Sequence, residues 1–344
     1  MFTFLDDMSL TIALVLFSMC AAVIGFVGTK LAGIVDEIAD RTGLGEAIAG
    51  AVLLGMATSL SGIVVSVTAA WTGKPELAMS NALGGIAVQT LFLTIADIAH
   101  RRANLEHAAA SLGNIIQAAL LLCLLSLLLI GRFAPDWTIW HVHPVTPLLF
   151  IAYLFGLRLV KSSQQHPMWN PAKTHETRED EPDEASGKLS LVRLWLSFLG
   201  FAITIGAMGW LLEKSATVIA VETGLSQAAV GVLLTSVATS LPELVTTVAA
   251  VRRGALTLAV AGIIGGNAFD TLFAAVSDVA YREGSIYHVT PDHVMLWVAI
   301  TVLMTGVLML GLLQRQEQGP GRIGFESISI IGLYLAGIAI LLMG

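Results

Sequence analysis

The sequence predicts an all-α membrane protein whose ten transmembrane helices form two inverted-topology five-helix repeats, with broken helices at the centre. Three observations predict this fold. The 344 residues are 56% hydrophobic and 12% charged, with a mean hydropathy of +0.81, whereas soluble domains average about 25% charged residues. The apolar residues fall into ten runs, each near the roughly 20 residues that cross a bilayer. The third observation is an internal repeat. A soluble enzyme, a nucleic-acid-binding protein and a disulfide-stabilised secreted domain are thereby excluded.

The apolar runs are the predicted membrane spans. The first five lie roughly at 8–36, 43–71, 77–99, 106–130 and 144–160, and the second five at 190–213, 224–251, 257–280, 290–313 and 324–343. Residues 1–160 are therefore the expected first repeat and residues 191–344 the second. The intervening residues 161–190 form a linker rich in Pro, Glu and Asp, a composition typical of solvated, disordered chain. Residues 1–7 contain two acids and no base, unlike a signal peptide, so we expect the first span to be retained.

The distribution of Lys and Arg predicts the orientation in the membrane. Thirteen of them fall on the side of the central linker and four on the opposite side, with Lys30 inside the first span left out. Cytoplasmic loops carry an excess of basic residues. We therefore expect a cytoplasmic linker, both termini outside, and a location in the plasma membrane, which is the inner membrane of a prokaryote.

The internal repeat appears when the chain is shifted by 181 residues. Residues 42–101 then align with residues 223–282, with 25 identities in 60 positions. The shift corresponds to five spans. Because five is an odd number, the two copies must enter the membrane from opposite faces. Inverted repeats are typical of transporters, because two matching halves can expose one central site alternately to each side.

Each copy of the repeat contains two predicted helix breaks. The first is TSLSG (58–62) in one copy and TSLPE (239–243) in the other. Pro242 lacks a backbone N–H, so the helix must kink or unwind there. The second is SNALGG (80–85) and AGIIGGN (261–267), where glycines permit close helix approach or broken hydrogen bonding. Carbonyl oxygens freed by such breaks, with nearby Thr and Ser hydroxyls, would form an oxygen cage for a hard cation.

Glu243 and Asp270 are the strongest candidates for cation ligands. Glu243 lies about twelve residues into an apolar run, where a carboxylate costs at least about 2.5–3.5 kcal/mol and by default indicates function. Asp270 follows 27 residues later, one helical turn past Asn267. Two carboxylates from neighbouring broken helices favour cations and oxygen coordination, and we expect protons to compete for them. A protonated Glu243 bonded to backbone is the structural alternative.

These segments resemble the calcium/cation antiporter superfamily, which includes the sodium/calcium exchangers. TSLPELVTT (239–247) followed by GIIGGNAFD (262–270) is similar to the family's second alpha repeat. The resemblance implies that Glu243 and Asp270 bind a metal cation, with Thr239 and Ser240 adding carbonyl or hydroxyl oxygens. Asn267 matches the asparagine of the family's G-S-N motif, whereas Gly266 stands where the family has serine.

The first copy departs from the family pattern. Gly62 stands where the family has a second glutamate, and Gly85 and Ile86 replace the serine and asparagine of the first G-S-N motif. Thr58 and Ser59 are retained as expected ligands, and Gln89 is the counterpart of Asp270. Fewer carboxylates should weaken binding of divalent ions, because calcium affinity depends on ligand charge.

Three functions therefore remain open. The chain could exchange a cation, Na⁺, K⁺ or Ca²⁺, against H⁺ or Na⁺ by alternating access around the two carboxylates. It could use cation binding to move a different substrate through the vacated first half. It could also be a degenerate membrane subunit that transports nothing. The repeat-related Asp97 and Asp278 are weaker candidates for a gate or proton relay, the alternative being ion pairs with Arg101 and Arg282 one turn on.

Other functional classes find no support in the sequence. It has no nucleotide-binding loop, no Ser/His/Asp set and no paired Cys/His ligands at usable spacing, so we expect no enzyme activity and no covalently bound cofactor. The expected partners are the lipid bilayer and inorganic cations (Na⁺, Ca²⁺, K⁺ or H⁺), with no nucleic acid. A homo-oligomer or a partner subunit stays open. Transport would then be driven by an ion gradient.

Overall fold

The computed structural model describes residues 8–42, 58–100, 103–165, 167, 169–172, 174, 190–319 and 323–343, and their regular structure is helical apart from one isolated β-bridge. Eight described helices are long and apolar enough to cross a membrane, or nine if one bent pair counts as a single span. The prediction of an all-α membrane protein is thus confirmed. The predicted second span, 43–71, falls partly outside the described residues, which include only its second part.

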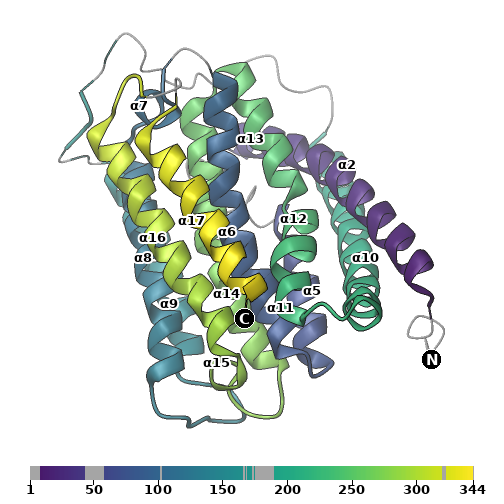
Figure 1. The fold of residues 1–344 in the computed structure, drawn as a ribbon. Helices are drawn as coiled ribbons and strands as arrows, with labels where there is room; N and C mark the ends of the chain where they lie inside the picture. Colours follow the sequence, from purple (N-terminus) through teal and green to yellow (C-terminus); the bar gives the residue numbers. More distant parts are fainter. Residues whose placement is uncertain are drawn as a thin grey trace.

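Figure 1 shows the described helices, coloured in chain order. In chain order they are α2 (Leu10–Thr42), α5 (Leu60–Trp71), α6 (Pro75–His100), α7 (Leu105–Ala108), α8 (Leu112–Phe133), α9 (Val145–Gln165), α10 (Leu191–Thr223), α11 (Gln227–Val230), the π-helical η2 (Gly231–Thr235), α12 (Ser236–Thr239), α13 (Leu241–Arg253), α14 (Leu256–Ala280), α15 (Ile286–Val289), α16 (Asp292–Gln314) and α17 (Phe325–Met343).

The helices of the two halves recur at the shift found in the sequence. Both α2 and α10 have 33 residues, and their first residues lie 181 positions apart. The short helices α7 and α15 are separated by the same number of residues. In Figure 1, α7 lies at the upper end of the molecule and α15 at the lower end. We call the upper end, where α9 ends and α10 begins, the linker end, and the opposite one the far end.

Helices α6 and α14 form the centre of the molecule, and α2 and α10 form a pair at its side (Figure 1). In the spans of α6 and α14, 89% of the most apolar window is buried, compared with 17% in α2 and 11% in α10. Lipid solvates apolar side chains as well as protein does, so exposed apolar faces on α2 and α10 are expected for spans at the periphery.

The α2–α10 pair contacts α13 and α5 through repeat-related glycines. A Cβ atom on Gly28 of α2 would collide with the ring of Pro242 at the start of α13. A Cβ atom on Gly209 of α10, 181 positions later, would lie 2.9 Å from the carbonyl oxygen of Ser61 in α5. Only residues without a side chain permit these approaches. The pair therefore lies directly against the two segments in which the sequence predicts a break.

The second predicted break in each repeat is wrong, because α6 and α14 are continuous helices through residues 80–85 and 261–267. The glycines permit close packing instead. A Cβ atom on Gly84 would lie 2.8 Å from the Cα atom of Val232 in η2. Glycine costs a helix only about 1 kcal/mol relative to alanine, so the tight contact is compatible with an unbroken helix.

Candidate cation site

The break at Pro242 places a helix N-terminus in the middle of the molecule. The chain bends by 45° between α11–α12 and α13, and Ser240 between them has the non-helical angles φ −95° and ψ 6°. Pro242 is tolerated in the first turn of α13, where its missing N–H has no helical partner to lose. Glu243 follows in that first turn, where the exposed amides and the helix dipole favour a negative charge.

Glu243 is almost completely buried, with 4% of its surface exposed. Ser59, just before α5, donates a hydrogen bond from its hydroxyl to Oε1 of Glu243 at 3.4 Å, and the side chain of Thr58 hydrogen-bonds to the same carboxyl group. The second oxygen, Oε2, is buried and has no hydrogen-bond partner. The alternative in which Glu243 is neutralised by backbone bonds therefore explains only part of its surroundings.

Asp270 lies next to this group, in the buried middle of α14. Its Oδ2 accepts a hydrogen bond of 2.7 Å from Nε2 of Gln89 in α6, and its Oδ1 has no partner. The Ser59 hydroxyl is within hydrogen-bonding reach of both carboxyl groups. Nε2 of Gln89 also donates to Oγ of Ser240 at 3.2 Å. Residues from both repeats thus meet at one place.

The remaining candidates, Asn267 and Thr239, form hydrogen bonds with other side chains. Asn267 donates from Nδ2 to Oγ1 of Thr90 at 2.9 Å, while its Oδ1 has no partner. The carbonyl oxygen of Thr239 accepts a hydrogen bond from the Ser61 hydroxyl at 3.2 Å. Thr90 and Ser61 were not predicted as part of the site. The sequence indicates them only in that each is a hydroxyl residue close to a predicted position.

Four buried side-chain oxygens in this cluster have no hydrogen-bond partner: Glu243 Oε2, Asp270 Oδ1, Gln89 Oε1 and Asn267 Oδ1. Buried polar atoms in proteins are nearly always paired, and an unpaired one calls for a water, an ion or a catalytic role. All four are oxygen acceptors, the ligand type that hard cations prefer. The cluster is therefore suited to a dehydrated cation.

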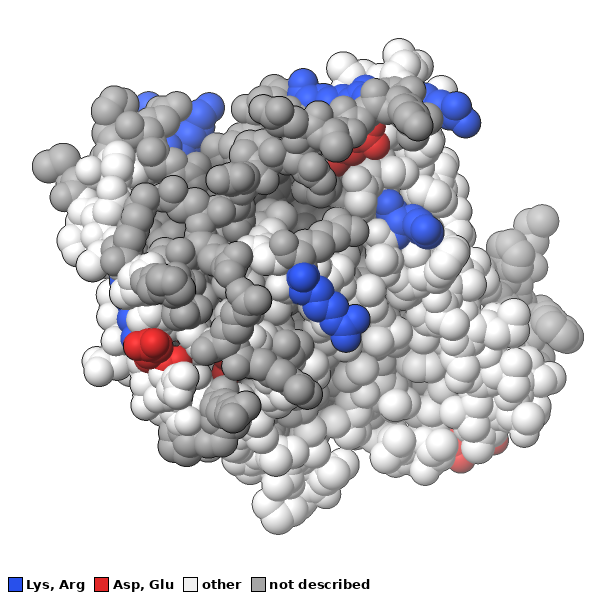
Figure 2. Space-filling view, turned by 90° about the horizontal axis from the view of Figure 1, so that it is seen from above, with Lys and Arg blue, Asp and Glu red and all other residues white. Residues whose placement is uncertain are grey.

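A cavity of about 150 Å³ leads to Glu243. It is lined by residues of α2, α13 and the start of α14, with Thr58: Thr29, Gly33, Thr58, Glu243, Thr246, Thr247, Ala249, Ala250, Ala255, Leu258, Ala259, Gly262 and Ile263. Because α13 ends and α14 begins at the linker end (Figure 1), the cavity lies between Glu243 and that end. Figure 2 looks down on this end and shows Lys and Arg side chains spread over it.

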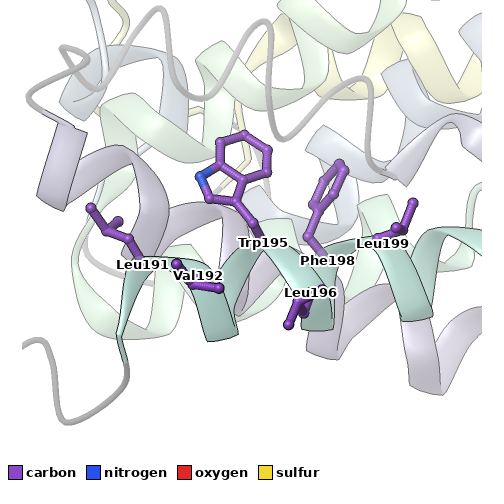
Figure 3. A pocket seen from close by; sticks show the side chains of 6 residues that line it. All are labelled: Leu191, Val192, Trp195, Leu196, Phe198 and Leu199. Carbon is purple, nitrogen blue, oxygen red and sulfur yellow. The ribbon is translucent and has the colours of Figure 1, made fainter.

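A second pocket has a different character. It lies along the first turns of α10 and is lined by Leu191, Val192, Trp195, Leu196, Phe198 and Leu199 (Figure 3). All six side chains are apolar or aromatic, so the pocket offers no ligand for an ion. Its place at the start of a predicted span suits contact with lipid chains.

Asp97 and Asp278 lie outside the cation site, at opposite ends of the molecule. Asp278 accepts hydrogen bonds from the backbone N–H groups of His143 and Ile286 and from the Thr146 hydroxyl. Asp97 accepts the repeat-related set, from Leu105, Gly324 and Ser327. Within the described residues, Arg282 forms no ion pair with Asp278, so that expected pair is wrong; Arg101 lies outside them. The backbone donors satisfy the aspartates instead.

Comparisons with known proteins cover both halves of the chain. The family model for the sodium/calcium exchanger protein matches residues 12–160 and again residues 193–343. The chain is 28% identical to the proposed antiporter CaxA of Alkalimonas amylolytica over 290 residues, 83% of this chain and 86% of that one. It is also 28% identical to the inner membrane protein YrbG of Escherichia coli over 285 residues, 81% and 82% of the two chains. Its fold is similar to that of the sodium-calcium exchanger NCX_Mj, with a TM-score of 0.64 at 19% identity over 96% of this chain and 99% of that one.

Proposed function

Because the chain belongs to the sodium/calcium exchanger protein family, a family of membrane antiporters, we propose that it is a secondary active transporter that exchanges a cation against H⁺ or Na⁺. The candidate cations are Na⁺, K⁺ and Ca²⁺. The observation that carries the proposal is the pair of buried carboxylates, Glu243 and Asp270, each with one unpartnered oxygen and both within reach of the Ser59 hydroxyl. Family membership and this site together favour transport over enzyme catalysis.

The proposed architecture is ten spans in two inverted five-helix repeats, 1–160 and 191–344. It is supported by the 181-residue recurrence of the helix bounds and by the positions of α7 and α15 at opposite ends (Figure 1). The proposed orientation, with the linker in the cytoplasm and both termini outside, is supported by the basic residues at the linker end (Figure 2). Similarity to the inner membrane protein YrbG supports a location in a prokaryotic inner membrane.

Alternating access would expose Glu243 and Asp270 first to one side and then to the other. The cavity beside Glu243 supports access from the linker end, and the α2–α10 pair is suited to move because it packs against the breaks through glycines. A carboxylate without a counter-ion is expensive in a membrane interior. Protons and cations would therefore replace one another on the same two groups, and this competition couples their gradients.

In this proposal, Ser59, Thr58 and Gln89 hold the carboxylates, while Ser240 and Asn267 line the site. Asp97 and Asp278 join helix ends through backbone hydrogen bonds instead of forming a gate. The two rival functions, transport of another substrate and a subunit that transports nothing, make different predictions for the cation site. A subunit without transport would not need ion binding at Glu243.

The test is the effect of Glu243→Gln on ion-dependent stability. Purified protein is unfolded thermally in Na⁺, K⁺, Ca²⁺, Mg²⁺ or Mn²⁺ at constant ionic strength. A bound ion stabilises the folded state by about 2.7 kcal/mol at a hundred times its dissociation constant. We expect one of these ions to stabilise the parent protein and Glu243→Gln to lose this effect, with loss of exchange of that ion in liposomes.

The matched control is Glu222→Gln, the same change at an exposed carboxylate near the end of α10, which should retain the stabilisation and the exchange. Undiminished exchange by Glu243→Gln would refute the assignment of the site. If none of the ions stabilises the parent protein, a subunit that does not transport is favoured.

A further inference from the structure

The half of the site where this chain lacks the second glutamate is filled by an aromatic ring. A Cβ atom on Gly62 would lie 2.6 Å from Cε2 of Phe273 and 3.4 Å from its Cζ. Gly62 is the repeat counterpart of Glu243, so the ring from α14 lies where a side chain at position 62 would begin. The space that a side chain at position 62 would enter is therefore already occupied by the Phe273 ring.

The Phe273 ring is supported by other aromatic side chains. It is 4% exposed and makes an edge contact with Phe269, with ring centres 6.2 Å apart and planes at 87°. Phe269 in turn contacts Tyr153 of α9 in the same manner, at 5.9 Å. Edge-to-face contacts of this kind stabilise a fixed arrangement of rings, so Phe273 does not readily leave the space above Gly62.

Gln89 blocks a second position in the same half, where a cation could otherwise bind. Its Nε2 has two hydrogens, and both have acceptors: Oδ2 of Asp270 at 2.7 Å and Oγ of Ser240 at 3.2 Å. The positive end of the amide thus lies against a carboxylate oxygen that a second cation would otherwise bind. Gln89 is itself the repeat counterpart of Asp270, so a position that holds an acid in one half holds a hydrogen-bond donor in the other.

We infer that Phe273 and Gln89 restrict the site to a single monovalent cation and exclude divalent cations; this inference rests on the proposed function. Calcium requires six to eight oxygens, and its affinity rises with the number of charged ligands. Among the described residues the site has four unpartnered side-chain oxygens, and two of these, on Glu243 and Asp270, belong to carboxylates. If one carboxylate binds a monovalent cation and the other carries a proton, the site has no net charge. A monovalent cation needs fewer charged ligands than calcium, so the four oxygens suffice to coordinate it.

The experiment measures binding of radioactive sodium and calcium to the purified full chain. The parent protein should bind about one sodium ion per chain, and calcium should neither bind nor displace the sodium. The variant Gly62→Glu/Phe273→Ala restores a carboxylate and removes the ring, so its affinity for calcium should rise by at least about tenfold. The matched control is Gly62→Glu/Phe92→Ala, which removes the repeat-related phenylalanine and leaves Phe273 above position 62.

A second variant, Gln89→Glu, keeps the size of the side chain and exchanges the amide for a carboxylate. It should also gain calcium binding, and it provides the test if the double variant does not fold. Calcium binding by the parent protein that Glu243→Gln abolishes would overturn the inference and leave the proposed function intact. The same holds if a folded Gln89→Glu gains no calcium binding. Binding of neither ion by the parent protein would instead refute the proposed function.

Discussion

At the scale of single residues, the hydrogen bonds of Asp97 can be compared with those of its repeat counterpart Asp278. Both aspartates accept three repeat-related hydrogen bonds. The second half has Tyr287 at the position where the first half has Glu106. Glu106 is 1% exposed, and its carboxyl group lies against that of Glu326. Since the second half forms the same connection without this acid, Glu106 is not needed to join the helices.

Glu106 should make the stability of the protein depend on pH. Burial, followed by the nearby carboxyl groups of Asp97 and Glu326, raises the pKa of Glu106 well above its ordinary value. The folded state therefore holds this proton more tightly than the unfolded state. Its contribution to stability is fully present below the ordinary pKa of glutamate and is lost as the pH rises through the raised pKa.

Replacing Glu106 with Gln keeps an uncharged side chain of the same size at every pH. We expect Glu106→Gln to lose less stability than the parent protein on going from about pH 5 to about pH 9, measured as the unfolding temperature in detergent. Glu317→Gln, at an exposed carboxylate of the same end, should follow the parent profile. Parallel profiles for Glu106→Gln and the parent protein would show that Glu106 is ionised in the folded state.

At the scale of helices, the sequence predicted the elements better than their interactions. Apolar runs indicated the spans, and Pro242 located the bend between α12 and α13, because both signals are local. The glycines at 84 and 85 were compatible with either a helix break or a close helix contact. The structure shows a close contact, because η2 packs directly against Gly84. The hydrogen bond from Gln89 to Asp270 joins residues 181 positions apart, and no local pattern encodes the direction of an amide.

A buried ion pair fastens α10 to the central helices near the far end. Nζ of Lys74, in the connection between α5 and α6, lies 2.9 Å from Oε1 of Glu213, whose side chain is fully buried. Nζ of Lys74 also donates to Oγ1 of Thr217 at 2.9 Å, and Lys214 approaches the other carboxylate oxygen at 3.5 Å. While the cavity near the linker end leads to Glu243, this pair holds α10 against the centre on the opposite side.

Breaking this ion pair from one side should be costly, whereas replacing both partners should not. Lys74→Met leaves the Glu213 carboxylate with the Thr217 hydroxyl at 3.2 Å and the longer contact to Lys214, neither of which replaces the close ammonium group. We expect a loss of about 3 kcal/mol in unfolding free energy. Lys74→Met/Glu213→Met should recover most of this loss, because two apolar side chains replace a desolvated pair. Thermal unfolding of the parent, both single variants and the double variant measures the coupling. Additive effects would show that the pair does not fasten α10.

At the scale of the whole molecule, the described arrangement is asymmetric between its two ends although its helices repeat. The cavity at Glu243 lies toward the linker end, and the Lys74–Glu213 pair lies toward the other. The sequence could predict the symmetric plan from the 181-residue shift. It could not predict which end gives access to the site, because two matching halves are compatible with either arrangement.

Access from the linker end can be measured by chemical modification of one cysteine. Thr247 lines the cavity one turn beyond Glu243 and is 5% exposed. With Cys20 and Cys123 replaced, Thr247→Cys should react with a membrane-impermeant thiol reagent in inverted vesicles, and the transported cation should slow the reaction.

The control is Val221→Cys, at an exposed position near the end of α10, which should react only in vesicles of the opposite orientation. Faster modification of Thr247→Cys from that opposite side would show that the protein opens there and would contradict the proposed access from the linker end.

The contacts of Gly28 and Gly209 also limit how this sequence can change during evolution. A methyl group at either position would enter the segment of broken or bent chain that it faces, whereas a methyl group on Gly33 or Gly200, on the same two helices, would meet no neighbouring atom within 4 Å. Packing therefore permits a side chain at the second pair of positions and excludes one at the first, although Gly33 also lines the cavity beside Glu243. Gly28 and Gly209 are repeat counterparts that face opposite halves of one site. We therefore expect both to remain glycine in related sequences, even where the two halves otherwise differ.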